Sequence, residues 1–258
     1  MRMTDASWWV TIALCMNLLA CSHIAQQDVA LQADVKTAAE VVAETRAFEK
    51  SIFAGWRHVT LPGKTATIYD FVRKDGRDAL TANAGTSASM MRRDVNLDAA
   101  KLDTVNFSWQ VPALIADADL AERDFDDSPV RIVLTFEGDK SKFSTKNAML
   151  SELAQVITGE PLPYATLMYV WCNKRHTGSV IVNPRTDRIR SIVVESGAKN
   201  LRQWLDYQRN IRADFEKAFG EMPGNLISVG IMTDSDNTKT QTAAAYGKVF
   251  FGEKLTAN

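Results

Sequence analysis

The sequence predicts a mainly β protein, an antiparallel β-sandwich with two inserted amphipathic helices. From Trp56 onward, short runs rich in β-branched and aromatic residues recur between turn signals. Within residues 131–136 the side chains alternate, which is typical of a sheet buried chiefly on one face. The helical segments do not alternate regularly with strands, so a doubly wound α/β fold is excluded.

The expected strands are short and separated by turn residues. Asp75-Gly76, for example, supplies turn chemistry between the first two. The expected strands cover residues 65–72, 79–83, 104–112, 130–136, 166–171, 179–182, 189–196, 226–233 and 246–251.

Two segments have helical spacing and are expected to lie across the sandwich by their apolar faces. Residues 146–157 end before Gly159 and Pro161, and residues 204–219 end before Gly220 and Pro223. The first apolar stripe consists of Met149, Leu150, Leu153, Val156 and Ile157. The second consists of Trp204, Ile211, Phe215, Ala218 and Phe219.

The amino terminus has the pattern of a bacterial lipoprotein signal peptide. An apolar run of signal-peptide length follows Arg2 and ends in Leu18-Leu19-Ala20-Cys21. Cleavage before Cys21 would leave a cysteine that carries lipid, and several acyl chains anchor a protein firmly to a membrane. Because Ser22 rather than Asp follows Cys21, the expected location is the inner leaflet of the outer membrane, facing the periplasm.

Three regions follow from this interpretation. Residues 1–20 are the signal peptide, residues 21–48 a tether or weak helix, and residues 49–258 the β-sandwich domain. Cys172 is then the one thiol left, so no intramolecular disulfide is expected, and a small buried side chain on a strand is favoured over a nucleophile. The net charge is −1 with scattered Lys and Arg, which excludes a nucleic acid partner.

Several phrases in the chain resemble one bacterial family of exported proteins, domain of unknown function 3047. The similarity covers roughly residues 53–251 and is strongest at 162–171 (LPYATLMYVW), 183–190, 209–221 and 231–238 (IMTDSDNT), with Phe107-Ser108-Trp109 and the acidic residues 124–127 extending it forward. The resemblance implies a jelly-roll-like β-sandwich, similar in outline to sugar-binding modules, and no established activity. Where the family usually reads Tyr-Gly-Asp, this chain has Tyr246-Gly247-Lys248.

A group of aromatic, amide and basic residues has the composition of a sugar-binding platform. Aromatic faces stack on the apolar face of pyranose rings, while amides and guanidinium groups bond the hydroxyls. The alternative is that these aromatic side chains belong to the core, since aromatic residues at period two in a strand are usually core residues. The candidate ligand-binding residues are Tyr164, Tyr169, Trp171, Asn173, Asn183 and Arg190.

Two acidic loops carry oxygen ligands of the kind that calcium binds, and they predict a structural calcium site if they meet. The alternatives are a hydrated turn for the first loop and an Asx-rich turn after a strand for the second. The candidate metal ligands are Asp124, Asp126 and Asp127 in the first loop and Asp234, Asp236 and Asn237 in the second.

No motif assigns a catalytic residue. The sequence therefore favours a lipid-anchored envelope protein that binds a carbohydrate or another envelope component without covalent chemistry, with the membrane as partner through its lipid. One alternative is a glycan hydrolase or lyase that uses acidic residues from the set Asp124, Asp127, Glu195, Asp234 and Asp236. The other is an envelope scaffold protein.

Overall fold

The computed structural model describes residues 53–252. The strands are β1 (Arg57–Thr60), β2 (Ile68–Lys74), β3 (Arg77–Gly85), β4 (Ala88–Leu97), β5 (Thr104–Gln110), β6 (Ser128–Phe136), β7 (Ala165–Cys172), β8 (Val180–Val182), β9 (Ile189–Ser196), β10 (Leu205–Asn210), β11 (Leu226–Asp234), β12 (Gln241–Tyr246) and β13 (Phe250–Phe251). The helices are the α-helices α3 (Thr145–Thr158) and α4 (Ile211–Phe219) and the 3₁₀ turns η1 (Ala99–Lys101) and η2 (Lys140–Lys142).

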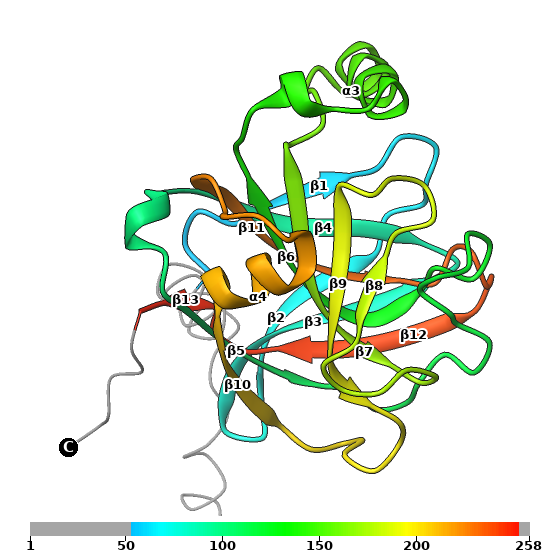
Figure 1. The fold of residues 1–258 in the computed structure, drawn as a ribbon. Helices are drawn as coiled ribbons and strands as arrows, with labels where there is room; N and C mark the ends of the chain where they lie inside the picture. Colours follow the sequence, from blue (N-terminus) through cyan, green and yellow to red (C-terminus); the bar gives the residue numbers. More distant parts are fainter. Residues whose placement is uncertain (1–52, 253–258) are drawn as a thin grey trace, which may run out of the picture. The chain divides into compact units, whose positions relative to one another are not determined.

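The strands form two sheets that enclose one main core (Figure 1). The seven-stranded sheet has the order β1-β4-β11-β6-β7-β9-β8. The six-stranded sheet has the order β10-β5-β12-β3-β2, with β13 paired to β5. Every pair is antiparallel except β7 and β9. The prediction of a mainly β, jelly-roll-like sandwich with two helices is confirmed.

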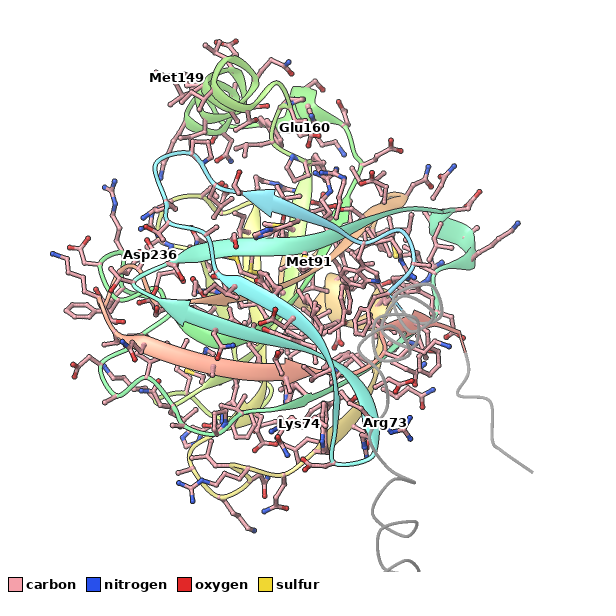
Figure 2. The ribbon with its side chains drawn as sticks, turned by 180° about the vertical axis from the view of Figure 1, so that it is seen from behind. Arg73, Lys74, Met91, Met149, Glu160 and Asp236 are labelled. Atoms are coloured by element: carbon pink, nitrogen blue, oxygen red, sulfur yellow. The ribbon has the colours of Figure 1, made fainter. Side chains whose placement is uncertain are left out.

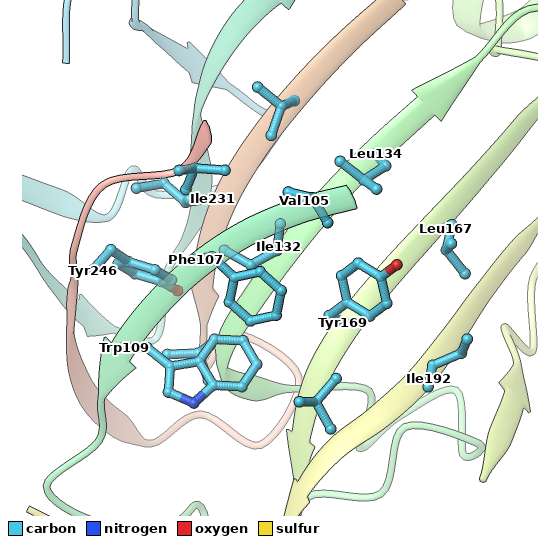
Figure 3. Close-up of a cluster of buried hydrophobic side chains, with 14 of the residues drawn as sticks. Val105, Phe107, Trp109, Ile132, Leu134, Leu167, Tyr169, Ile192, Ile231 and Tyr246 are labelled. Carbon is cyan, nitrogen blue, oxygen red and sulfur yellow. The ribbon is translucent and has the colours of Figure 1, made fainter. Parts of the chain in front are cut away.

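The core is formed by the alternate, inward-facing residues of both sheets. From the six-stranded sheet, Phe107 and Trp109 of β5 face inward, and Phe107 stacks on Tyr169 of β7 with 5.5 Å between ring centroids. Figure 3 shows these rings together with aliphatic side chains of β6 and β9. Aromatic contacts of this kind join the two sheets across the core and contribute beyond the area that they bury.

The strand assignment departs from the prediction in several places. The prediction lacks β1, β4 and all of β12 except Tyr246, and residues 205–210 form a strand instead of the first turns of a helix. In β10, Leu205, Tyr207 and Arg209 lie on one face and pair with β5 in a continuous register. The helix starts only after Asn210, whose side-chain oxygen accepts a hydrogen bond from the backbone N–H of Ala213 at 2.9 Å.

The two helices differ in what they contact. α4 packs by Ile211, Phe215 and Ala218 into the core, and Phe136 of β6 contacts the Phe215 ring with 4.7 Å between centroids. By contrast, α3 stands apart from both sheets (Figures 1 and 2), and its apolar stripe is exposed. The prediction that this stripe lies on the sandwich is wrong. Within residues 53–252, no helix is both long and apolar enough to span a membrane.

Candidate ligand-binding site

The predicted aromatic platform lies inside the protein. Tyr169 and Trp171 are 0% and 1% exposed and belong to the main core. The Tyr169 hydroxyl donates to Asp214 of α4 at 2.9 Å, and the Trp171 indole N–H donates to the backbone carbonyl of Gly197 at 3.0 Å. Their period of two reflects burial against the other sheet, so the prediction that these rings bind a ligand at the surface is wrong.

The other predicted ligand residues hold loops in place. Tyr164 is 5% exposed and donates to Glu221 at 2.9 Å. The Asn173 amide donates to Ile115 and Ala116 carbonyls, the Asn183 amide to Asp126, and the Arg190 guanidinium to the carbonyls of Asp187 and Ala218. Because Tyr169 and Trp171 are in the core and these four side chains are bonded to different parts of the chain, the predicted group is not a single surface site.

The two acidic loops do meet. Carboxylate oxygens of Asp127, Asp234 and Asp236 lie within 4.8 Å of one another, and Asp126 and Asn237 are close by. Asp124 is exposed and outside this group. Each of the three carboxylates already has protein donors: Lys64 bonds Asp236, the backbone of residues 237 and 238 bonds Asp127, and Arg131 bonds Asp234.

Arg131 is the centre of this acidic cluster. Its buried guanidinium donates to both oxygens of Asp234 at 2.9 Å and to Asp126 at 3.2 Å. Burial by itself lowers the pKa of Arg131, but the charges of Asp234 and Asp126 raise it overall. Burial raises the pKa of Asp234 to about 7, and Asp127 and Asp126 add to this effect although Arg131 opposes it.

As built, the acidic cluster is an ion-pair and hydrogen-bond network that ties residues 126–131 to residues 234–238. A calcium ion takes six to eight oxygen ligands, and it would have to displace Lys64 and the donors of Asp127. The donor set therefore fits a structural network better than a cation site.

A different surface has the properties of a ligand site. A cavity of about 290 Å³ opens where β5, β10 and the segment leading into β13 meet. This β5/β10/β13 cavity is lined by Asn106, Phe107, Ser108, Asp206, Tyr207, Gln208, Lys248 and Phe250. Its volume is just below the range of small-molecule pockets, about 300–1,000 Å³.

Strand register places the polar groups of the cavity on the outer face of the six-stranded sheet. Asn106 pairs with Gln208 on one side and with Phe250 on the other, and residues paired in this way point to the same face. Ser108 lies two residues along β5, and a Cβ added to Gly247 would come within 2.1 Å of its hydroxyl oxygen. The chain thus passes close to β5 at Gly247 before it reaches Phe250.

Asn106 has an unused hydrogen-bond acceptor. The residue is 3% exposed, its amide nitrogen donates to the Gly252 carbonyl at 2.6 Å, and its Oδ1 has no partner among the residues that the structure describes. A buried acceptor without a donor costs free energy of roughly 1–3 kcal/mol, which a ligand hydroxyl would recover. Asn106 also lines the cavity, so this unused acceptor lies next to its wall.

The charges around the cavity are unequal. Asp206 accepts two hydrogen bonds from Arg77 at 2.8 and 3.0 Å, so its charge is balanced. Lys248 is exposed, with its ammonium 5.6 Å from the centroid of the Phe250 ring. The cavity wall therefore carries a net positive charge at Lys248 next to an aromatic face.

Two larger depressions have less suitable linings. One of about 580 Å³ borders Tyr164 and Lys140, but its amide and carboxylate groups, Asn225 and Glu137, bond each other at 3.3 Å. Another of about 410 Å³ is bordered largely by small and apolar residues such as Ile68 and Leu114. Neither includes a buried acceptor without a partner in the described part of the chain.

Sequence reasoning missed the cavity residues for an identifiable reason. Asn106 and Ser108 alternate with Val105, Phe107 and Trp109, which signals a strand with one polar face but not what covers that face. In the sequence, Lys248 stands out only as a departure from a family pattern, and residues 206 and 208, which line the same cavity, fall in the segment predicted to be helical. The alternation of polar and apolar residues in 104–110 is the one feature of the sequence that could have indicated a polar surface at the cavity.

The fold and this cavity define a β-sandwich with a small polar pocket on the outside of one sheet. The chain belongs to the family described as protein of unknown function (DUF3047), whose model matches residues 54–250. No curated protein matches the chain.

Solved structures with some likeness include three glycan-related proteins. The family 11 carbohydrate-binding module of the cellulase Lic26A-Cel5E of Clostridium thermocellum is 8% identical, with a TM-score of 0.37 over 79% of this chain and 91% of its own. A Cel12A cellulase derived from Rhodothermus marinus is 10% identical, with a TM-score of 0.40 over 78% and 93%. The xyloglucanase domain of NopAA from Sinorhizobium fredii, in complex with cellobiose, is 9% identical, with a TM-score of 0.39 over 77% and 93%. Likenesses at this level carry no argument about what the chain binds.

Proposed function

We propose that this protein is a lipid-anchored, non-catalytic carbohydrate-binding protein of the cell envelope, and that the β5/β10/β13 cavity holds the sugar. The observation that carries the proposal is the wall of this cavity, which combines the amide residues Asn106 and Gln208 with the ring of Phe250.

The chemistry of the cavity wall suits a polyhydroxylated ligand. A sugar presents hydroxyl groups that both donate and accept, together with an apolar face of C–H groups. Asn106 offers an acceptor, the exposed Gln208 offers an amide with both functions, and the half-buried Phe250 offers a ring for stacking. A hydrocarbon ligand would leave these polar groups unpaired and is disfavoured.

Lys248 adds a preference for an acidic saccharide. Its ammonium is a positive charge on the cavity wall that has no ion-pair partner within residues 53–252, whereas Asp206 is paired with Arg77. A uronic acid or another carboxylate-bearing sugar would place its negative charge near Lys248. Lys248→Ala should therefore lower the affinity for acidic saccharides more than the affinity for neutral ones.

The carboxylates of the described chain favour binding over hydrolysis. Glycoside hydrolysis uses two carboxylates flanking the bond, about 5 Å apart for retention and about 6.5–9.5 Å apart for inversion. The cavity wall includes one carboxylate, Asp206. Glu195 accepts hydrogen bonds from Tyr207 and Asn200 instead, and the acidic cluster is held by Arg131.

The envelope location rests on residues outside the described range. Cys21 and the apolar run before it lie in residues 1–52, as does the predicted tether. We propose acylation of Cys21 and retention in the inner leaflet of the outer membrane. Mass spectrometry of the amino-terminal peptide should find lipid on Cys21, and Cys21→Ser should release the protein from the membrane fraction. An unmodified Cys21 in the exported protein would contradict this part of the proposal.

A saccharide screen followed by calorimetry tests the cavity. Residues 49–258 would be screened against neutral and acidic glycans, and each hit would be titrated into Gln208→Ala and Phe250→Ala. Both variants should bind at least about tenfold more weakly, because a stacking face or a ligand hydrogen bond is lost. Asp70→Ala is the matched control, an exposed acidic residue of β2 outside the cavity lining. Equal affinities in all variants would place the ligand elsewhere.

Calcium is tested separately with a chelator. Because the three carboxylates of the acidic cluster already have protein donors, we expect the melting temperature to be unchanged by chelation, whereas Asp234→Ala lowers it because Arg131 and the Ser128 N–H lose their acceptor. A fall in melting temperature on chelation, reversed by added calcium, would establish the predicted calcium site.

A further inference from the structure

The helix α3 has its polar residues inside and its apolar residues outside. Its buried side chains are Asn147 and Ser151, whereas Met149 and Val156 are 65% and 83% exposed. Leu153 and Ile157 are also exposed, so the apolar side chains follow one stripe with the spacing i, i+4, i+7 and i+8. In a water-soluble helix the apolar face normally packs on the core, so this stripe calls for a covering partner.

Polar contacts fix α3 in this orientation. The Asn147 amide donates to Asp187 at 2.6 Å and accepts from the Thr186 hydroxyl at 2.8 Å. Ser144 caps the start of the helix, and Gly159 in the left-handed conformation ends it. The apolar stripe is therefore presented outward by specific hydrogen bonds on the opposite face.

Basic side chains lie at the base of the same projection. Lys140 and Lys142 belong to η2, immediately before α3, and Lys146 is in its first turn. The acidic residues of this segment are Asp139, which accepts hydrogen bonds from Ser141, and Glu152. The three lysines thus exceed the two acids, and Glu160 beyond the helix is paired with Arg92.

We propose that α3 and η2 form a contact with a phospholipid bilayer, with the stripe of Met149, Leu153, Val156 and Ile157 in the interfacial layer and the three lysines at anionic headgroups. An exposed apolar stripe with lysines beside it can lie in the interfacial layer of a bilayer, with the apolar side chains toward the acyl chains. The excess of lysines complements anionic lipid, and this favours a bilayer over a second copy of the chain, which would bring the same lysines together.

This contact goes beyond the proposed sugar binding and does not use the cavity. Figures 1 and 2 both show α3 at one end of the sandwich, while Figure 1 shows β5 and β10 toward the other end. A bilayer at α3 leaves the β5/β10/β13 cavity open to solvent. The two proposals therefore succeed or fail independently.

A fluorescent probe on α3 tests the contact in the full chain. Cys15 and Cys21 are replaced by Ser, the buried Cys172 is kept, and an environment-sensitive dye is attached to Val156→Cys. Vesicles of phosphatidylcholine and phosphatidylglycerol should shift its emission to the blue, and a nitroxide in the lipid chains should quench it. Vesicles of phosphatidylcholine alone should have a weaker effect, because the lysines lose their partner.

The control probe is at Ile68→Cys, since Ile68 of β2 is 63% exposed and equally apolar. The emission wavelength of the dye at position 68 should stay at its value in water, even when another part of the chain holds the protein on the vesicle. In a second experiment, Leu153→Glu with Val156→Glu should lower the vesicle partition coefficient about tenfold or more, with unchanged circular dichroism.

Two results would overturn the proposal. One is a probe at position 156 that stays as exposed to water as the probe at position 68 when vesicles are in excess. The other is a blue shift that grows with protein concentration without lipid, because a second copy would then be what covers α3.

Discussion

The helices α3 and α4 have the same sequence signals and opposite environments. Each has a side-chain N-cap, an apolar stripe and a glycine in the left-handed conformation at its end. In α4 the stripe enters the core through Ile211, Phe215 and Ala218, and in α3 it faces solvent. Capping and periodicity therefore specify that a helix forms and where it ends, whereas the surface that covers its apolar face is a tertiary property.

The largest expected contrast is in the cost of removing apolar side chains. Phe215→Ala should lower the free energy of unfolding by about 3–5 kcal/mol, because Phe215 is fully buried and contacts Phe136 and Phe219. Leu153→Ala should change it by no more than about 0.5 kcal/mol, since Leu153 is exposed. Urea unfolding of both variants measures the difference. Similar costs would mean that α3 packs on the sandwich in solution.

The polar anchors of the two helices provide a second contrast. Asp214 of α4 is buried and bonds Arg209 and Tyr169, so Asp214→Ala should cost about 2 kcal/mol. The neutral Asn147 of α3 bonds Asp187 and Thr186, and Asn147→Ala should cost about 1 kcal/mol. Hydrogen exchange would report the second change as faster exchange confined to α3. Equal global destabilisation by both substitutions would contradict the contrast.

These contrasts show how far the sequence predicts the structure. The alternation of Ile132, Leu134 and Phe136 identified a core strand correctly, since period two follows directly from strand geometry. Tyr169 and Trp171 had the same period, and the side of the sheet that they face depends on Phe107 and the rest of the other sheet.

The candidate site was predictable only in part. The acidic cluster brings the predicted residues together with the exception of Asp124, because two loops carry Asp at the ends of adjacent strands β6 and β11. The central residue, Arg131, lies in β6 between core residues that point to the opposite face. No local pattern in the sequence shows that the carboxylates of Asp126 and Asp234 contact its guanidinium. The β5/β10/β13 cavity depends on the register of three segments that are distant along the chain, which no local pattern contains.

In the acidic cluster, the buried carboxyl group of Asp234 should make the free energy of unfolding depend on pH. The pKa of Asp234 is about 7 in the folded protein, above its value in the unfolded chain, so the folded state binds the extra proton. Its contribution to stability is fully present below the unfolded-state pKa and is lost as the pH rises through the folded-state pKa. Between about pH 5.5 and 7, the free energy of unfolding should therefore fall by at most about 1.4 kcal/mol per pH unit.

Urea unfolding across this pH range measures the slope, and Asp234→Asn should remove most of it, since Asn does not titrate. A wild-type stability that rises from pH 5.5 to 7 would mean that Arg131 outweighs burial and keeps the Asp234 carboxyl ionised.

The smallest expected contrast concerns the helix caps. Asn210→Ala should cost about 1 kcal/mol of global stability, because α4 unfolds with the core. Ser144→Ala removes the same type of cap, whose oxygen accepts from Asn147 N–H at 3.3 Å, but it should mainly fray α3. Thermal unfolding followed by circular dichroism should show a lower midpoint for the first variant only. A matching shift in the second would indicate that α3 and the sandwich unfold together.

The most direct measurement of the central claim is an amide and side-chain NMR map of residues 49–258 titrated with a saccharide that the protein retains. The account predicts that the largest shifts fall on the side-chain amides of Asn106 and Gln208 and on the backbone around Phe250. Shifts centred instead on the depression beside Tyr164, or on the acidic cluster around Arg131, would contradict it.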